Sequence, residues 1–372
     1  MAKNTLFRIL LKLFQPLQKQ NSPHLENYLI VSSTGVGDSL WGTPAVRIIK
    51  KTYPNARVSL LTSPVGYEIF KNSPYIDEFF IVRDPLFPKL IPLYKKLKKR
   101  RFAKAFVLHS SQRPLLPLLA FLQIPVRIGT AGLQKGLDDL LTDKIPWKIS
   151  QHEIARRLSL IKTPLQDNGQ LEIFLDPEEH KRGREIAAGQ TNWIVLHPGA
   201  KDSFKKWPAE NFIELGRLLA RKIPKSGIAI TGNSQEQDLC RNVAANIPKA
   251  VSLAGKISLR EMAAFLDHVS LFITNDTGPM HLAFARKTPT IALFSGTDPK
   301  LCGPYQINNK AWVVKRMPTC TPCLKKKCRS PFCLMQITPK EIYNLVINIW
   351  VNKAQKNQNN QENLNNYEKP FI

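Results

Sequence analysis

Segments with the pattern of strands and of helices alternate along this chain, and the alternation runs through twice. Short apolar runs are each followed by a polar turn and a longer amphipathic segment, as the βα units of a parallel sheet require. The first series begins at residues 28–33 and the second at 193–197, with a charged stretch at 176–190 as the expected hinge. The sequence therefore predicts an α/β protein with two Rossmann-like domains, residues 28–185 and 186–353, that face a central cleft.

The expected elements follow from these patterns. Strands are predicted at residues 28–33, 57–62, 79–82, 105–109 and 126–129 in the first half, and at 193–197, 227–231, 271–274 and 290–294 in the second. Helices are predicted from the first turn to about residue 50, and at 209–222, 258–268, 279–286 and 339–353.

Residues 1–27 and 354–372 differ in composition from the rest of the chain. Near the N-terminus, basic residues lie opposite an apolar stripe at helical spacing, formed by Leu6, Ile9, Leu10, Leu13 and Leu17. Such a basic amphipathic helix either lies in a membrane interface or docks on the protein's own core, and periodicity does not distinguish the two. Residues 354–372 are rich in Asn and Gln, which predicts a disordered polar tail.

The chain is strongly basic, with 54 Lys and Arg against 28 Asp and Glu, a formal net charge of +26. This excess indicates a polyanionic partner: nucleic acid, an anionic membrane surface or a phosphorylated glycan. Eight basic residues and no acidic one lie within 89–104, and nine lie between Asp298 and Glu341. These runs are either solvated surface or a membrane-facing surface. Nucleic acid is the less favoured partner, because no dedicated RNA or DNA motif is present.

No apolar stretch approaches the ~18 residues that span a bilayer. Arg8 and Lys12 interrupt the apolar run at the start, which argues against a secretory signal. We therefore expect a cytoplasmic protein, whose cysteines serve as thiols or metal ligands rather than disulfides. Four of the six cysteines fall within 14 residues: Cys320, Cys323, Cys328 and Cys333. Four thiolates can close a tetrahedral zinc site, and iron–sulfur ligation is the less favoured metal alternative. This segment therefore holds either a structural metal ion or free thiols or adventitious disulfides.

Two strand-ending turns carry residues suited to a ligand, because ligands in an open α/β sheet bind beyond the carboxyl ends of the strands. Gly37 and Asp38 follow the first strand. Asp38 is either a helix cap or a general base that accepts a proton from a substrate hydroxyl. Asp276, Thr277 and Gly278 follow another buried strand and open a helix. There, a side chain caps the helix, or free backbone N–H groups bind a phosphate.

Further turns of the second half offer charged side chains. Lys205 or Lys206 is either a solvated lysine or a positive charge that neutralises a diphosphate. Glu236 is either a first-turn glutamate favoured by the helix dipole or an acceptor of two hydrogen bonds from a ribose diol.

Four short motifs occur in a fixed order. They are Gly-Asp-x4-Thr-Pro-Ala from Gly37, His-Pro-Gly-Ala from His197, Lys-x-Trp-Pro from Lys205 and Asn-Asp-Thr-Gly-Pro-Met-His from Asn275. Over residues 28–350 this series resembles glycosyltransferase family nine, the ADP-heptose:lipopolysaccharide heptosyltransferases of Gram-negative bacteria. The resemblance implies a GT-B fold, with the acceptor on the N-terminal domain and the ADP-sugar on the C-terminal one.

The resemblance also assigns roles to residues. Asp38, after Gly37, matches the catalytic base, and His281 belongs to the last motif with a role either in the site or in packing. The donor-binding positions match Lys205 (Lys206 is the less favoured equivalent) and Glu236, Ile257 near adenine, Asp276 on the sugar hydroxyls, and Thr277 and Gly278 at the phosphates.

The implied chemistry is inverting glycosyl transfer. Asp38 would deprotonate an acceptor hydroxyl, which attacks the anomeric carbon from the face opposite ADP. Lys205 and the N–H groups at 277–278 would take up the leaving-group charge. No Asp-x-Asp motif is present, so we expect activity without a cofactor or divalent ion. The acceptor would be the lipopolysaccharide core, reached by an enzyme peripheral on the inner face of the inner membrane.

Two other functions stay open at this point. One is a related GT-B enzyme that uses another nucleotide-sugar. The other is a non-catalytic protein that binds a glycolipid or nucleic acid. A preference for ADP over UDP or GDP argues against the first, and loss of turnover on replacing Asp38 argues against the second.

Overall fold

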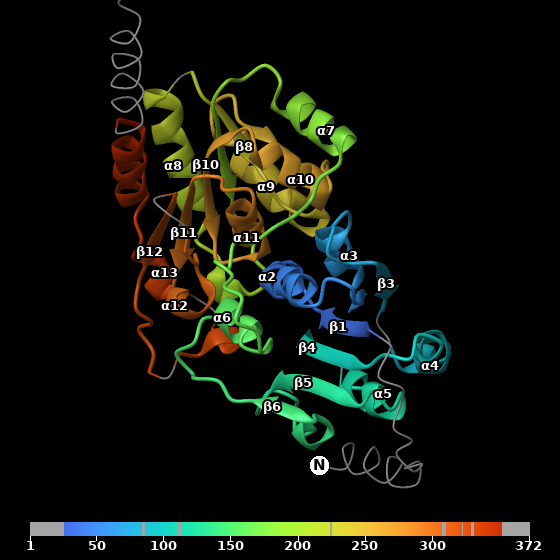
Figure 1. The fold of residues 1–372 in the computed structure, drawn as a ribbon. Helices are drawn as coiled ribbons and strands as arrows, with labels where there is room; N and C mark the ends of the chain where they lie inside the picture. Colours follow the sequence, from blue (N-terminus) through green and yellow to red (C-terminus); the bar gives the residue numbers. More distant parts are fainter. Residues whose placement is uncertain are drawn as a thin grey trace, which may run out of the picture.

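The computed structural model describes residues 26–83, 86–110, 113–223, 225–306, 310–321, 323–328 and 331–351. Within these residues the chain forms two six-stranded parallel sheets (Figure 1). The N-terminal sheet has the order β3 (Glu78–Ile81), β2 (Arg57–Thr62), β1 (Asn27–Ser33), β4 (Lys104–Ser110), β5 (Val126–Thr130) and β6 (Asp143–Ile145). The C-terminal sheet has the order β12 (Ala311–Lys315), β11 (Thr290–Phe294), β10 (Val269–Asn275), β7 (Trp193–His197), β8 (Gly227–Ile230) and β9 (Val251–Ser252). Both follow the doubly wound order, so the prediction of two Rossmann-like units is confirmed.

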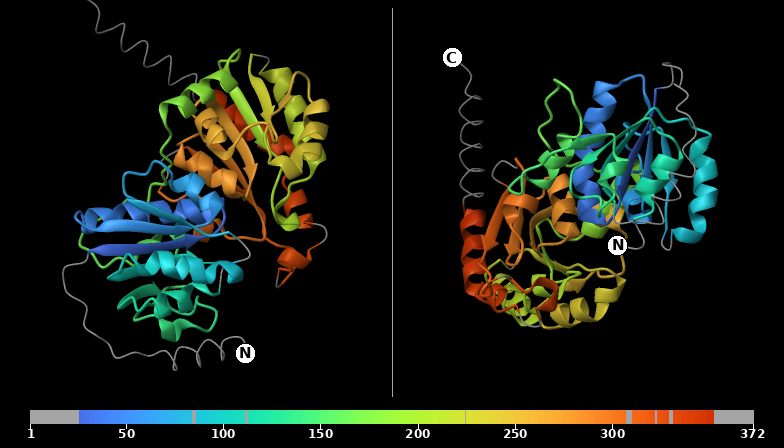
Figure 2. Two further views of the ribbon diagram at one scale, coloured as in Figure 1. Left: turned by 90° about the vertical axis from the view of Figure 1, so that its right-hand side faces the viewer. Right: turned by 90° about the horizontal axis from the view of Figure 1, so that it is seen from below.

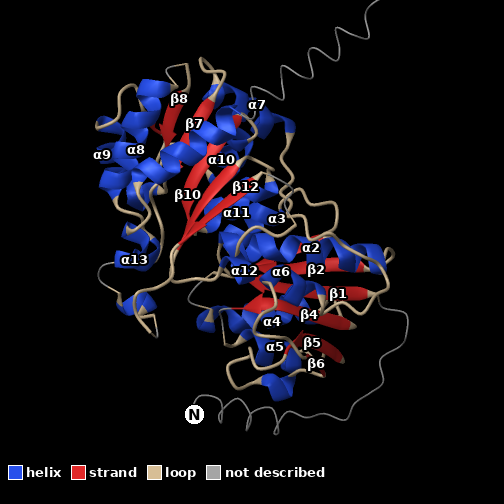
Figure 3. Ribbon diagram, turned by 90° about the vertical axis from the view of Figure 1, so that its left-hand side faces the viewer, coloured by secondary structure: helices blue, strands red, loops and turns tan. Residues whose placement is uncertain are grey.

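Helices cover both faces of each sheet (Figures 2 and 3). The N-terminal half contains α2 (Val36–Thr52), α3 (Pro64–Phe70), α4 (Leu90–Lys98), α5 (Leu115–Phe121) and α6 (Glu153–Leu158). The C-terminal half contains α7 (Pro177–Ala187), α8 (Ala209–Lys222), α9 (Gln237–Ala245), α10 (Leu259–Leu266), α11 (Gly278–Ala285), α12 (Pro299–Cys302), α13 (Phe332–Met335) and a last helix at 339–351. Short 3-10 turns lie at η1 (Phe87–Lys89), η2 (Asp138–Leu140), η3 (Ser203–Lys205), η4 (Ser234–Glu236) and η5 (Lys325–Lys327).

The predicted strands are found to within two residues at each end, but β6, β9 and β12 were not predicted. All three are edge strands. The first two have three and two residues, and every described side chain of β12 is at least partly exposed. Edge strands bury less apolar surface, so they lack the apolar runs that mark central strands. The predicted N-terminal helix and polar tail lie outside the described residues.

Helix α2 contains a proline, and its sequence compensates for the missing hydrogen bond. Pro44 has no N–H to donate to the carbonyl oxygen of Leu40, one turn earlier. The hydroxyl of Thr43 donates to that carbonyl instead, at 2.8 Å, and accepts a hydrogen bond from the backbone N–H of Glu172 at 3.1 Å. The Thr-Pro pair therefore fits a continuous helix and also fixes the connecting segment against it.

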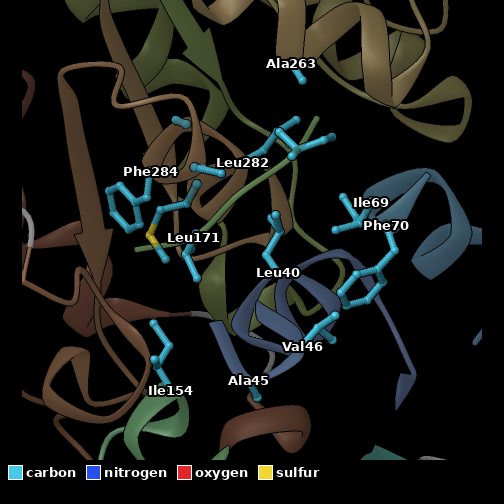
Figure 4. Packing of buried hydrophobic residues seen from close by; sticks show 14 of the residues in the cluster. Leu40, Ala45, Val46, Ile69, Phe70, Ile154, Leu171, Ala263, Leu282 and Phe284 are labelled. Atoms are coloured by element: carbon cyan, nitrogen blue, oxygen red, sulfur yellow. The ribbon is translucent and has the colours of Figure 1, made fainter. Parts of the chain in front are cut away.

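The two halves share a hydrophobic core at their junction (Figure 4). Leu40 and Val46 on α2 and Leu282 and Phe284 on α11 belong to one buried cluster. Helix α2 packs against α11, and α3 packs against α10. The Arg260 guanidinium of α10 reinforces this contact by donating to the carbonyl oxygens of residues 68 and 174, at 2.6 and 2.5 Å.

The charged stretch predicted as a hinge contains helix α7. This helix begins with a capping box between Asp176 and Glu179, and it packs against α10 of the C-terminal half. The domain boundary between residues 185 and 186 stays a prediction. Among the described helices, none is both long and apolar enough to cross a bilayer.

Candidate active site

The first turn of α2 holds Asp38 at the carboxyl end of β1. The N-cap position is occupied by Gly35, and the Asp38 carboxylate contacts side chains instead. Its Oδ1 lies 3.1 Å from Nη2 of Arg157 and 3.9 Å from Nε2 of His109. The Asp38 side chain is 32% exposed. A carboxylate held on one side and open on the other is suited to accept a proton.

Behind Asp38 lies a buried charge cluster on α6 that the sequence did not reveal. The side chain of Arg157 is fully buried, and its Nη1 lies 2.5 Å from Oε2 of Glu153. The same Glu153 oxygen accepts from Arg156 at 2.6 Å. Burial opposes ionisation of Glu153, but the two arginines outweigh it and hold the pKa of Glu153 at about 2. Burial also lowers the pKa of His109.

The opposing turn runs from Asn275, at the end of β10, to Gly278, at the start of α11. The Asp276 carboxylate is buried, and its Oδ2 lies 2.6 Å from both Nζ of Lys205 and Oγ1 of Thr297. Thr277 occupies the N-cap position but makes no side-chain capping hydrogen bond. The structure therefore does not support the alternative that Asp276 or Thr277 only caps the helix, and an N-terminus without a side-chain cap suits a phosphate.

Asn275 joins three of the four sequence motifs. Its buried side-chain amide donates to the carbonyl oxygens of Pro198 and Gly199, at 2.9 and 3.3 Å. Its Oδ1 accepts from the backbone N–H of Trp207 at 3.1 Å, and Nε1 of Trp207 donates to the carbonyl oxygen of Ile337. These bonds place Lys205, two residues before Trp207, beside Asp276. Among the described residues, the contact with Asp276 is made by Lys205 and not by the partly buried Lys206.

The Glu236 carboxylate lies against the His-Pro-Gly-Ala turn. A Cβ at Gly199 would come within 2.2 Å of its Oε1, so only glycine allows this approach. Glu236 also forms a capping box with Asn233. Nearby, Nδ1 of His197 contacts the Thr231 hydroxyl at 3.1 Å, and burial lowers the pKa of His197 to about 4. Ile257 is only partly buried and packs against the shared core.

His281 lies at the contact between the two turns. Its ring meets the Trp41 ring edge to face, with centroids 4.7 Å apart. A Cβ at Gly37 would lie 2.9 Å from Cδ2 of His281, and one at Gly278 would lie 2.8 Å from Cβ of Val36. The ring is fully buried, which lowers the pKa of His281 to about 4. Its position serves packing and also brings Asp38 and Asp276 to the same junction.

The four clustered cysteines line one small cavity of about 20 Å³ beside Phe204. Sγ of Cys333 lies 2.6 Å from the Ser295 hydroxyl. Among the described residues, no three His, Cys, Asp or Glu side chains are arranged to hold a metal ion. The zinc site therefore stays a prediction, which metal analysis of the purified protein tests, and no chemistry of the site depends on it.

Sequence reasoning missed Thr297 and the cluster of His109, Glu153 and Arg157. Glu153 and Arg157 are one helical turn apart, a spacing typical of ordinary helix ion pairs. The contacts of Arg157 and His109 with Asp38, and of Thr297 with Asp276, join residues far apart along the chain, and no local pattern marks them. Asn275 and Trp207 were visible only as members of motifs. A buried amide at the end of a strand is the signal that could have identified Asn275, because buried polar groups require partners.

Comparison with known proteins places this geometry in a family. The sequence profile of glycosyltransferase family 9 (heptosyltransferase) matches residues 92–333. Lipooligosaccharide heptosyltransferase 2 of Campylobacter jejuni is 26% identical over 331 residues, which cover 86% of this chain and 97% of that protein. Lipopolysaccharide heptosyltransferase 3 of Escherichia coli is 28% identical over 76% of this chain and 88% of its own length.

Two solved structures share the fold. E. coli ADP-heptose lipopolysaccharide heptosyltransferase II superposes with a TM-score of 0.72 at 20% identity, covering 88% of this chain and 99% of that one. An E. coli heptosyltransferase with ADP superposes with a TM-score of 0.66 at 17% identity, covering 87% of this chain and 99% of that one. These likenesses confirm the predicted GT-B fold. Since the family profile also spans more than half of the sequence, this chain belongs to glycosyltransferase family 9.

Proposed function

We propose that this chain is an inverting heptosyltransferase that moves heptose from ADP-heptose to the inner core of lipopolysaccharide, with Asp38 as the general base. The observation that carries the proposal is the apposition of two strand-ending turns. Asp38 lies in the first turn of α2, Asp276 precedes α11, and these helices pack against each other. A partly exposed carboxylate and a turn suited to a sugar diphosphate thereby lie on two helices that pack together.

The donor would occupy the C-terminal side of the junction. Its diphosphate would lie on Lys205 and on the backbone N–H groups that open α11. Lys205 is paired with Asp276 at 2.6 Å, so a bound diphosphate must share or replace that ion pair. Asp276 would then bind sugar hydroxyls, Glu236 the ribose, and Ile257 the adenine.

Transfer needs one proton acceptor and one leaving group. Asp38 accepts the proton of the acceptor hydroxyl while the oxygen of that hydroxyl bonds to the anomeric carbon. The bond from that carbon to ADP breaks, and ADP leaves with the electron pair. Because attack and departure occur on opposite faces, the configuration inverts. No cofactor takes part in this sequence.

A basic surface beside α4 supports a peripheral position at the anionic cytoplasmic face of the inner membrane. A groove of about 690 Å³ between β3 and α4 is lined by Arg83, Lys89, Lys96 and Lys99. Ile91, next to it, is 70% exposed. Exposed cations beside apolar groups suit an anionic leaflet that holds a glycolipid acceptor. The run of 89–104 is not uniform, however, because Arg100 pairs with Glu78.

Calorimetric titration of the purified protein with ADP, UDP and GDP, followed by a transfer assay with ADP-heptose, tests the function. The acceptor is a lipopolysaccharide core that lacks the heptose, and NMR of the product gives its anomeric configuration. We expect ADP to bind tightest, transfer to proceed with EDTA present, and the product to be inverted. Tighter UDP or GDP binding would favour another nucleotide-sugar. Absence of all nucleotide binding would favour the non-catalytic alternative.

A further inference from the structure

The resemblance assigns a base but no residue that holds it. We propose that Arg157 and Glu153 form a positioning pair that fixes the Asp38 carboxylate for proton transfer. The inference rests on the proposed function, in which Asp38 is the base. Arg157 does not touch substrate; it acts through Asp38.

Arg157 is held on three sides. Its Nη1 donates to Oε2 of Glu153 at 2.5 Å and to the Glu153 carbonyl oxygen at 3.0 Å. Its Nη2 donates to Oδ1 of Asp38 at 3.1 Å, and the guanidinium carbon lies 5.3 Å from the centre of the Trp41 ring. Because the Arg157 side chain is fully buried, its guanidinium has little freedom to move.

The geometry leaves one oxygen of the base for chemistry. The contacts of Asp38 with Arg157 and His109 both use Oδ1. Neither contact involves Oδ2, so within the part of the chain that the structure describes we assign Oδ2 as the oxygen that accepts the acceptor's proton. Restraining Oδ1 stops the carboxylate from rotating, and small errors in the position of a catalytic group cost rate.

The charge of Glu153 is what keeps Arg157 in place. A buried guanidinium requires compensating negative charge. With its pKa held at about 2, Glu153 stays ionised at every neutral assay pH. It fixes one end of the guanidinium so that the other reaches Asp38, 119 residues earlier in the chain.

The neighbouring arginine shows that structural need alone does not explain the contact. Arg156 is also buried and also pairs with Glu153, at 2.6 Å. Its other guanidinium nitrogen donates to the Thr130 hydroxyl at 2.8 Å, so it contacts Glu153 but not Asp38. Arg156 is therefore the matched control for Arg157.

The test compares Arg157→Lys, Glu153→Gln and Arg156→Lys in heptosyl transfer, with ADP affinity measured by calorimetry. For Arg157→Lys we expect kcat to fall roughly 10- to 100-fold, with the donor KM and ADP affinity within about twofold of wild type. In Glu153→Gln, kcat should fall less, by about 3- to 10-fold, because the Arg157 guanidinium keeps a neutral hydrogen-bond acceptor at residue 153. Arg156→Lys should stay within about threefold.

A second readout separates positioning from folding. Added methylguanidinium should restore part of the turnover of Arg157→Ala and none of that of Arg156→Ala. Wild-type kcat in Arg157→Lys, or equal losses in the two lysine variants, would overturn the inference. The base itself is checked separately: if wild-type protein transfers no heptose, or if Asp38→Asn stays active, the proposed function fails. If Asp38→Asn is inactive while Arg157→Lys is unimpaired, only the positioning pair fails.

Discussion

Two aspartates at the ends of central strands face the same junction, and their surroundings differ. Asp276 is almost fully buried, with a side chain 7% exposed, and a cation and a hydroxyl both lie 2.6 Å from its Oδ2. Asp38 is 32% exposed, and its hydrogen bond to Arg157 is longer, at 3.1 Å. The same residue type, after a central strand in each half, is thus almost fully buried in one half and partly exposed in the other.

The difference teaches how one fold supports two tasks. A buried carboxylate with two close polar partners has little freedom to move, which suits an anchor for hydroxyl groups and for Lys205. A carboxylate with one restrained oxygen and an open side can exchange a proton with a substrate. Under the proposed function, the C-terminal turn is the binding side of the junction and the N-terminal turn is the reacting side.

The largest expected effect contrasts the two aspartates directly. Asp38→Asn should lower kcat by roughly 10²- to 10⁴-fold, the usual contribution of a general base, with ADP affinity nearly unchanged. Asp276→Asn should instead raise the donor KM, because it alters a binding contact. Steady-state kinetics with ADP-heptose, combined with ADP calorimetry, checks both. If Asp276→Asn reduced kcat as much as Asp38→Asn with no change in KM, the division of tasks would be wrong.

A smaller effect is expected from the cation on the binding side. Lys205→Ala should weaken ADP binding about 10- to 100-fold, since a charge-assisted contact to the diphosphate contributes roughly 1.5–3 kcal/mol. It should also lower the free energy of unfolding by roughly 1–3 kcal/mol, because Asp276 stays buried with Thr297 alone. Calorimetry measures the ADP affinity, and urea unfolding measures the free energy of unfolding. Lys206→Ala is the control, and equal losses in both variants would assign the contact to general charge.

The glycines test the contact between the two sides. Gly37→Ala would place a Cβ 2.9 Å from the buried His281 ring, and Gly278→Ala one 2.8 Å from Val36. Either change should push the turns apart and lower kcat by about tenfold, as small misplacements do. Gly35→Ala is the matched control on the same turn, because a Cβ there meets nothing within 4 Å. Turnover equal in all three variants would show that the close approach does not matter.

The features that the sequence predicted are local motifs, and those that it did not predict depend on contacts between distant segments or lie on edge strands. The turns with Asp38 and with Asp276 were predictable because each follows a strongly apolar strand and because their motifs are local. The pairing of Lys205 with Asp276 was not, since it depends on Asn275 joining three turns from separate strands. Arg157 gave no signal at all: its contact with Asp38 arises only when α6 packs on α2. Edge strands such as β12 escaped because their partial exposure leaves no distinct apolar run.

The smallest expected effect concerns pH and again compares a side chain of each region. His197 on the binding side and His281 at the junction are both buried, which lowers the pKa of each to about 4. In the unfolded chain a histidine takes up its proton near pH 6.5. Between pH 6.5 and 4 the unfolded state therefore binds more protons than the folded state, so this contribution to stability is complete above pH 6.5 and is lost as the pH falls towards 4.

At pH 5.5 each of the two histidines should lower the free energy of unfolding by about 1 kcal/mol. Urea unfolding at pH 7.5 and 5.5 should show this loss, and His281→Gln should reduce it by about one histidine's share. If His281→Gln kept the full pH dependence, water would have to reach the ring, and the two turns would not be packed as closely as their glycines suggest.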